Sequence, residues 1–317
     1  MNVRTVLPKD AIPSIDEPTF GDEYVGESDD EVLVLDLGSE PSRAYPIRIL
    51  SYHEIVNDTV DDEPVAVTWC PLCASAVVYD RTVGDRVLTF GVSGKLADDD
   101  LVMYDRETGS EWKQSLRGCI AGPLEGETLR VLPASILTWE RFTDEHPEGV
   151  VLQPTRMKSE AASDDDTPAP VDYSMEPYSQ YFDSEGFGLA AHRDTDGQRT
   201  WSRDDLDPKD VVLGLIRDGE AVGYPLSRVT DAGGVVHDSV GGREVVVFAT
   251  DGGIHAFENP GFEFESVGDA SFSADETVWD GVTGRSEDGR RLKRLPARRL
   301  FAFTWQDDHG ADTFYSL

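Results

Sequence analysis

The sequence predicts a mainly β protein with a few short helices, built from two degenerate repeats of one β-rich, sandwich- or barrel-like unit. Two observations lead to this class. Short β-branched or aromatic runs recur throughout the 317 residues, with Gly, Pro or Asp between them. Several of these runs also reappear in the same order about 180 residues later, and an internal repeat of that length decides the architecture.

The expected strands of the first repeat come from its apolar runs. These are Val32–Leu37, Val65–Trp69, Ala76–Asp80 and Arg86–Val92. In the second repeat, two consecutive glycines predict a tight turn before a strand over Arg243–Phe248. Two short helices are expected over Ile47–Val56 and Thr138–His146, the latter with Thr138 or Ser135 as its N-cap.

The repeat is supported by matched segments. Glu31–Pro46 aligns without a gap with Asp210–Pro225, and Asn57–Val60 aligns with His237–Val240. Later matches pair Asp105–Gly109 with Asp280–Gly284 and Leu132–Ala134 with Leu295–Ala297. We therefore expect a first repeat over 1–155, an acidic Pro- and Ser-bearing linker over 156–170, and a second repeat over 171–317.

The charge of the chain restricts its partners and surroundings. The formal net charge is −34, from 62 acidic and 28 basic residues. Such a surface repels itself unless salt screens it, so a salt-accumulating cytoplasm is expected. Phosphates would meet a negative field, which excludes nucleic acid as a partner. No apolar stretch approaches the length of a membrane span, and the start of the sequence lacks the pattern of a signal peptide.

The repeat also separates residues of the shared fold from residues of a site. Cys70 and Cys73, in the segment CPLC, fall opposite Thr250 and Gly253 of the second repeat. His53 and Glu54 likewise have no counterpart there. Since the cysteines and the His-Glu pair are present or absent together, we expect one joint site in the first repeat.

Three interpretations of this site stay open. Cys70, Cys73 and His53 could ligate a transition metal (zinc, iron or copper), leaving a coordination position open, with Cys119 a weaker candidate ligand. Cys70 and Cys73 could instead act as a thiol–disulfide pair, in an oxidoreductase or a redox sensor. The cysteines could also be buried residues of a non-catalytic binding or scaffold module.

The chemistry of the site is left open at this stage. Cys70 and Glu54 are the catalytic candidates, as a nucleophile and as a general base. No Gly-rich phosphate loop or HExxH helix occurs, so no organic cofactor is expected. The partner would be a small molecule or a protein that the sequence does not identify.

Four segments carry a resemblance to a known family. They are Ala44–Asp58, Val65–Arg81, Leu88–Gly94 and Leu101–Arg106. Together they resemble DUF3179, a family whose function is not established, and the acidity suggests a haloarchaeal-type member. The family motif includes the pairs that stand here as His53-Glu54 and Cys70/Cys73. The family usually has Gly where this chain has Ala74, and it usually lacks a cysteine at the position of Cys119. Other members often look exported, whereas the start of this sequence shows no such pattern, which leaves open a truncated start or a cytosolic member.

Overall fold

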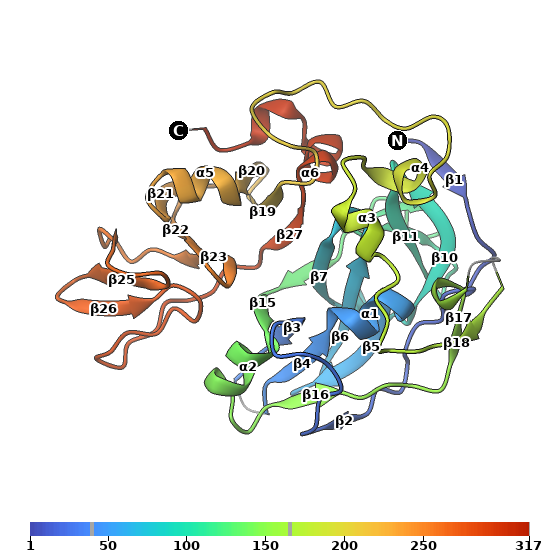
Figure 1. The fold of residues 1–317 in the computed structure, drawn as a ribbon, viewed down its shortest axis with the longest axis horizontal. Coiled ribbons are helices and arrows are strands. Elements are labelled where there is room, and N and C mark those ends of the chain that lie inside the picture. The colour runs from blue at the N-terminus through green and yellow to red at the C-terminus, as the bar shows by residue number, and fades with distance from the viewer. Residues whose placement is uncertain (39–40, 164–166, 317) are drawn as a thin grey trace. The chain divides into compact units, whose positions relative to one another are not determined.

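A computed structural model describes residues 1–38, 41–163 and 167–316 of the chain (Figure 1). It has 41% strand and 15% helix, so the predicted mainly β class is confirmed. Among the described residues the helices are short, and the longest, α6 (Ala302–His309), has eight residues. The strands form several sheets, which include a half-barrel.

The chain packs as two compact units, and their boundary differs from the predicted repeat boundary. Unit 1 consists of Met1–Leu132 and Leu137–Ser202, and unit 2 of Pro133–Ile136 and Arg203–Leu317. Residues 171–202, which we assigned to the second repeat, thus belong to unit 1. They do so because their aromatic side chains, such as Tyr178 and Tyr181, are buried there.

The predicted linker over 156–170 is also more structured than its composition indicated. Strands β17 (Lys158–Ser159) and β18 (Ala169–Pro170) pair with each other, and η2 (Glu160–Ala162) lies between them in sequence. Residues 164–166 of this segment lie outside the described residues.

Unit 1 contains three main groups of strands. The first sheet has the order β1 (Val3–Thr5), β10 (Phe90–Ala97), β11 (Asp100–Asp105), β12 (Glu111–Lys113) and β13 (Gly118–Ala121). The second group is β5 (Ile55–Val60), β6 (Glu63–Cys70) and β7 (Ser75–Asp80), with β14 (Arg130–Leu132) on β7. The third contains β3 (Glu31–Leu35), β4 (Arg43–Pro46), β16 (Val150–Leu152) and β2 (Phe20–Gly21).

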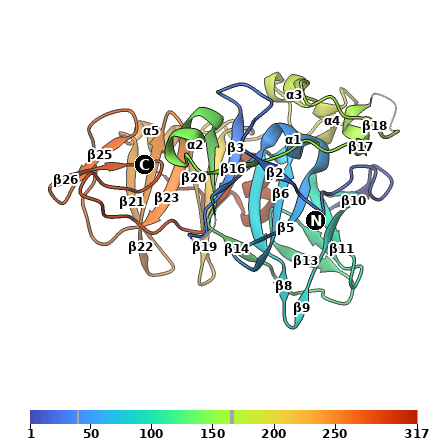
Figure 2. The ribbon, with the colours of Figure 1, turned by 90° about the horizontal axis from the view of Figure 1, so that it is seen from below.

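Smaller elements complete unit 1. A hairpin of β8 (Thr82–Val83) and β9 (Arg86–Val87) extends beyond the ends of β5 and β6 (Figure 2). The helices are α1 (Ile47–His53), α2 (Trp139–Glu145), α3 (Ser179–Asp183) and α4 (Gly188–His192), with the 3₁₀ turn η1 (Pro71–Cys73). Strand β15 (Ser135–Thr138) precedes α2, and Thr138 caps that helix as predicted, accepting a hydrogen bond from the Arg141 amide.

Helix α1 is shorter than the sequence indicated. It was expected to reach Val56, but it ends at His53, and Glu54 has a positive φ of 57° with ψ −30°. Strand β5 begins at the next residue, Ile55, because the β-branched run that follows favours a strand. Glu54 therefore lies at the junction between α1 and β5.

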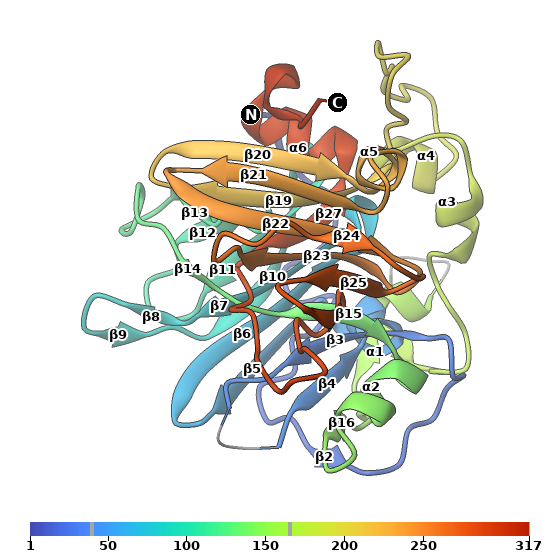
Figure 3. The same ribbon diagram turned by 90° about the vertical axis from the view of Figure 1, so that its left-hand side faces the viewer.

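Unit 2 contains three groups of three antiparallel strands (orange to red in Figure 3). They are formed by β19 (Val211–Arg217), β20 (Glu220–Pro225) and β27 (Arg298–Phe301), by β21 (Val235–Val240), β22 (Arg243–Thr250) and β23 (Gly253–Glu258), and by β24 (Glu265–Ser266), β25 (Ser271–Ala274) and β26 (Thr277–Asp280). Helix α5 (Leu226–Asp231) follows β20, and the 3₁₀ turn η3 (Ala311–Thr313) follows α6. Two apolar clusters form the core, one around Tyr224 and Val247 and one around Phe248 and Trp279.

Each unit contains a similar tyrosine–aspartate hydrogen bond at a matched position of the predicted repeat. Tyr45 donates to Asp58 at 2.6 Å, and Tyr224 donates to Asp238 at 2.8 Å. Each aspartate also accepts from the next backbone amide at 2.7 Å, as short polar side chains do in turns. These contacts agree with the predicted repeat, which itself stays a prediction.

Candidate functional site at the CPLC turn

The CPLC segment forms a tight turn between two buried strands. Strand β6 ends at Cys70, η1 covers Pro71–Cys73, and Cys70 pairs with Ser75 as β7 begins. Ala74 closes the turn in a left-handed conformation, with φ 43° and ψ 34°. Both cysteines are buried, with exposures of 2% and 0%. The turn thereby holds two sulfur atoms on one side of a hairpin.

A carboxylate that the sequence analysis did not select completes this group. Asp100 begins β11, directly after the hairpin turn at Asp98 and Asp99, and it is fully buried. Its Oδ2 accepts hydrogen bonds from the Ser115 amide at 2.8 Å and from the Ser115 hydroxyl at 2.7 Å. Ligand atoms of Cys70, Cys73 and Asp100 all lie within 4.8 Å of one another.

The hairpin turn beside Asp100 is fixed by its own contacts. The Asp99 carbonyl accepts a hydrogen bond from the Cys73 thiol at 3.5 Å. The buried Asp99 carboxylate forms ion pairs with Arg4 and, at 3.5 Å, with Arg199. Gly188, at the start of α4, lies so close to this carboxylate that a Cβ atom there would come within 2.4 Å of it. The chain around Asp100 is therefore held from several sides.

Glu54 is the second acidic group near the thiols. Its carbonyl accepts a hydrogen bond from the Trp69 amide at 2.8 Å, which joins it to the strand that carries Cys70. The side chain is 7% exposed. Burial, and then the charges of Glu160 and Asp100, raise the pKa of Glu54 from 4.5 to about 8. A positive φ in a residue with a side chain, together with a raised carboxyl pKa, is typical of functional sites.

His53 does not join the cysteines, contrary to our prediction. Its Nδ1 is 2.9 Å from the Pro13 carbonyl and its Nε2 is 2.7 Å from the Tyr173 hydroxyl. A carbonyl only accepts, so Nδ1 carries the proton and Nε2 accepts from Tyr173. Burial lowers the pKa of His53 to about 4, which keeps the ring neutral. Both ring nitrogens of His53 are thus hydrogen-bonded, and the bond to Tyr173 holds that residue against α1. Among the described residues, the group of side chains that could hold a metal ion does not include His53.

Cys119 lies elsewhere as well. It sits on β13, and its thiol donates to the Ala121 carbonyl at 3.4 Å. It is not part of the Cys70–Cys73–Asp100 group, so its candidacy as a ligand finds no support here.

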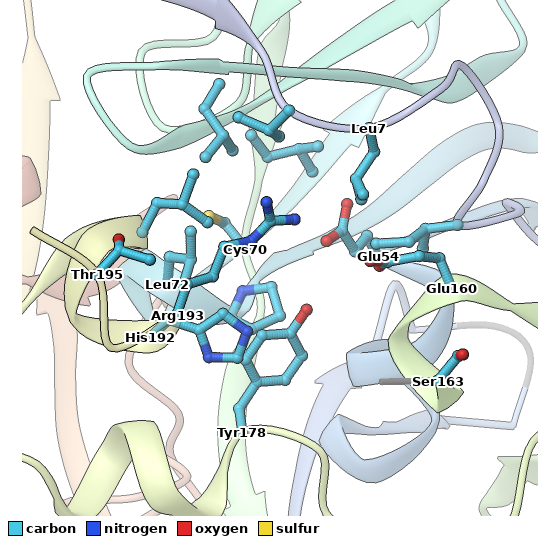
Figure 4. Close-up of a pocket in the computed structure, with 16 residues that line it drawn as sticks. Leu7, Glu54, Cys70, Leu72, Glu160, Ser163, Tyr178, His192, Arg193 and Thr195 are labelled. Carbon is cyan, nitrogen blue, oxygen red and sulfur yellow. The ribbon is translucent and has the colours of Figure 1, made fainter. Parts of the chain in front are cut away.

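A cavity of about 560 Å³ opens beside the cysteine turn (Figure 4). Cys70 and Glu54 line it, together with Glu160, Tyr178 and Arg193. Cys73 is not among the lining residues. The remaining wall is largely apolar and includes residues such as Leu7, Ile12, Leu96 and Leu101. The volume is in the range of small-molecule sites.

Residues 171–202 form part of this wall. The Tyr181 hydroxyl donates to the Leu72 carbonyl at 2.7 Å, inside the CPLC turn, and accepts from the Gly188 amide at 3.0 Å. The ring of Tyr178 stacks on that of His192, with centroids 4.8 Å apart. This aromatic segment therefore covers the cysteine turn. Its aromatic composition was visible in the sequence, but nothing there indicated which surface it covers.

The Cys70 thiol is electrostatically unsuited to act alone as a nucleophile. Burial raises the pKa of Cys70, although a hydrogen bond from Cys73 opposes the effect. A buried thiol with a raised pKa stays protonated at neutral pH, whereas the thiolate is the reactive form. A bound metal ion would instead deprotonate the thiols outright.

Among the described residues, no helix is both long and apolar enough to cross a membrane.

Comparison with known proteins gives a family and no further relatives. No curated protein and no solved structure matches the chain. The family model described as "Protein of unknown function (DUF3179)" matches residues 9–312. Since that match spans nearly the whole sequence, the chain belongs to the DUF3179 family.

Proposed function

We propose that unit 1 binds one transition metal ion through Cys70, Cys73 and Asp100. The observation that carries this proposal is the convergence of two buried sulfurs and one buried carboxylate within 4.8 Å. Thiolates bind zinc at about 2.3 Å and carboxylate oxygens at about 2.0–2.2 Å, so ligands of one ion lie about 3.5–4 Å apart. The three side chains need to move by only about 1 Å to meet that spacing.

The donor set favours zinc, with iron and copper as the other ions that soft thiolates accept. Three protein ligands leave a fourth position for water or substrate, as in catalytic zinc sites. Since Cys70 lines the cavity, we expect that position to face the cavity. Glu54 is the nearby group that would hold or release a proton there, and the proposed activity is therefore metal-assisted acid–base chemistry.

Metal analysis of the purified full-length protein tests this. After growth with added zinc, iron and copper, the protein and Cys119→Ser should each retain about one ion per chain. Cys70→Ser and Cys73→Ser should lose it, and Asp100→Asn should bind it more weakly. Cys119→Ser is the matched control, since it removes a buried thiol outside the group. A folded protein that carries no metal after such growth would refute the proposal.

A thiol–disulfide pair is the second candidate, because the same two sulfurs are neighbours in the CPLC turn. It predicts a reversible Cys70–Cys73 disulfide, detectable by alkylation and mass spectrometry with and without oxidant. Thiols that stay reduced under oxidant would remove this candidate. If both the metal and the disulfide are absent, a non-catalytic binding module is the function that remains.

We further propose that the protein works in a salt-rich, reducing cytoplasm, as a haloarchaeal-type member would. The net charge of −34 favours screening by salt. None of the three cysteines, all within the described residues, forms a disulfide, which fits a compartment that keeps thiols reduced. The same negative charge disfavours nucleic acid as a partner.

A further inference from the structure

We infer that the cavity beside Cys70 binds a small uncharged molecule, which carries a hydroxyl or amide group at one end of a short apolar chain. Two polar side chains of the lining, Glu54 and Tyr178, carry the inference, together with an apolar wall (Figure 4). The inference goes beyond the proposed metal centre, because neither side chain belongs to that group.

Glu54 and Tyr178 have polar ends that the protein leaves without a hydrogen bond. Both line the cavity, and their exposures are only 7% and 8%. Among the described residues, neither the Glu54 carboxyl nor the Tyr178 hydroxyl has a hydrogen-bond partner. The buried carboxylate of Asp100, in contrast, is held by Ser115. Since buried polar groups are nearly always hydrogen-bonded, two exceptions beside one cavity indicate a ligand.

The two polar ends can share one end group of a ligand. Burial, and then the charge of Glu54, raises the pKa of Tyr178 well above 10, so the two side chains interact across the cavity wall. A hydroxyl or an amide both donates and accepts hydrogen bonds. Such a group can therefore bond to the tyrosine hydroxyl and to the carboxyl, whether the carboxyl is protonated or ionised, and we place it between them.

The charges of the lining favour an uncharged ligand. Burial, and then the charges of Glu160 and Asp100, raises the pKa of Glu54 to about 8, and burial lowers the pKa of His192. The charged groups that remain in the lining, Glu160 and Arg193, have opposite signs, and both already have interactions in the structure. An ion that entered the cavity would lose its hydration while both nearby charges are engaged, which costs more than burying a neutral polar group.

The rest of the lining suits an apolar chain. Leucine and isoleucine side chains from separate segments of unit 1 face the cavity, among them Leu7, Ile12, Leu72, Leu96 and Leu101. Each methylene that is buried against them should raise the affinity about fourfold. The cavity volume of about 560 Å³ is sufficient for a chain of several carbons.

Calorimetry on the full-length protein at pH 7 tests the selection for an uncharged ligand. The probes are 1-hexanol, hexanamide, hexylammonium and hexanoate. We expect the two uncharged probes to bind with one-to-one stoichiometry, at least about tenfold more tightly than either ion. 1-Butanol should bind about fifteenfold more weakly than 1-hexanol, because it lacks two methylenes.

Variants of the two polar side chains locate the end group. Tyr178→Phe and Glu54→Leu should each weaken hexanol binding about three- to tenfold. Glu54→Gln keeps a group that donates and accepts, so its affinity should stay within about twofold of wild type. Tyr315→Phe is the control, since it removes a tyrosine hydroxyl outside the cavity lining. Circular dichroism checks folding, and Tyr178→Phe keeps the test decisive if Glu54→Leu does not fold.

The same titrations separate this inference from the proposed metal centre. Hexanol should bind equally to zinc-loaded and metal-depleted protein, because the metal ligands are other side chains. The metal analysis can therefore fail while the cavity still binds its probe. Hexanol binding confined to the zinc-loaded protein would show that the metal holds the end group, and would overturn the inference.

Three other results would overturn it. No binding of either uncharged probe would remove the ligand. An ion that binds as tightly as hexanol would show that a charge governs the cavity. Full affinity for hexanol in Tyr178→Phe or in a folded Glu54→Leu would show that the end group does not lie between these two side chains.

Discussion

Replacing Glu54 by Gln should change how the stability of unit 1 depends on pH. The pKa of Glu54 is raised from 4.5 to about 8 by burial and by the charges of Glu160 and Asp100. Below pH 4.5 the carboxyl is protonated in both the folded and the unfolded chain, so it imposes no penalty. Between pH 4.5 and 8 the unfolded chain releases the proton and the folded chain keeps it, so stability falls as pH rises. Above pH 8 the penalty is constant.

The magnitude follows from the width of that window. Each pKa unit corresponds to about 1.4 kcal/mol, so wild type should lose about 3–4 kcal/mol of stability between pH 5 and 8 on account of Glu54. Glu54→Gln has no such proton to release. A buried amide without a partner lowers stability by about 1–3 kcal/mol, but it does so equally at every pH. The difference between the two proteins should therefore grow by about 3–4 kcal/mol across this range.

The assay must follow unit 1 separately from unit 2. Denaturant unfolding at pH 5, 6, 7 and 8, read by pulsed hydrogen exchange in peptides of β6 and β7, gives the free energy of unfolding for that unit. Glu127→Gln serves as the exposed control. If wild type and Glu54→Gln show parallel pH profiles, the carboxyl is not held protonated and the description of the cavity is wrong.

Three further predictions concern the turn at Ala74, the segment 171–202 that covers the cysteine turn, and the salt concentration of the solvent. Ala74→Gly should be about 1–2 kcal/mol less destabilising than Ala76→Gly in thermal unfolding, because only Ala74 is left-handed; equal losses would count against strain at the turn. Tyr173→Phe removes the hydroxyl that bonds His53 at 2.7 Å, so limited proteolysis should cut residues 171–202 faster, and an unchanged rate would contradict this role. Raising potassium chloride from 0.1 to 2 M should stabilise the chain as the Debye length shrinks from about 10 Å to below 3 Å, and greater stability in low salt would remove the halophilic interpretation.

The sequence was informative wherever the chemistry is local. The strand runs around the CPLC segment and the cap at Thr138 follow from propensities over a few residues, and the structure places them close to where we expected. Glu54 and Cys70 were selected because the second repeat lacks them, and both line one cavity.

The third ligand could not be predicted because it depends on tertiary register. Asp100 is the last of three consecutive aspartates, a run that indicates only a solvated turn. It reaches the cysteines because β10 and β11 pair with Ala97 opposite Asp100, which leaves Asp98 and Asp99 to form the turn. One residue of slip would turn Asp100 to the other face.

His53 was misjudged for a related reason. Its absence from the second repeat was taken to mean a role shared with the cysteines, but a residue can also be lost with the segment that it anchors. In this chain that segment is residues 171–202, and the bond from Tyr173 to His53 spans 120 positions. No local pattern encodes a contact of that length.

The backbone at Glu54 gives the strongest argument that its side chain serves a function. In the alignment of the predicted repeats, Gly234 stands 180 positions after Glu54, and both residues have positive φ, 86° and 57° respectively. Their carbonyls accept matched hydrogen bonds, from Trp69 at 2.8 Å and from Ala249 at 2.9 Å. Glycine adopts this conformation freely, whereas a residue with a side chain loses about 1–2 kcal/mol. Glu54→Gly should therefore fold, and it should unfold at higher denaturant than the wild type at pH 8. A variant that fails to fold would mean that the carboxyl serves the fold, and its placement in the cavity would then carry no functional meaning.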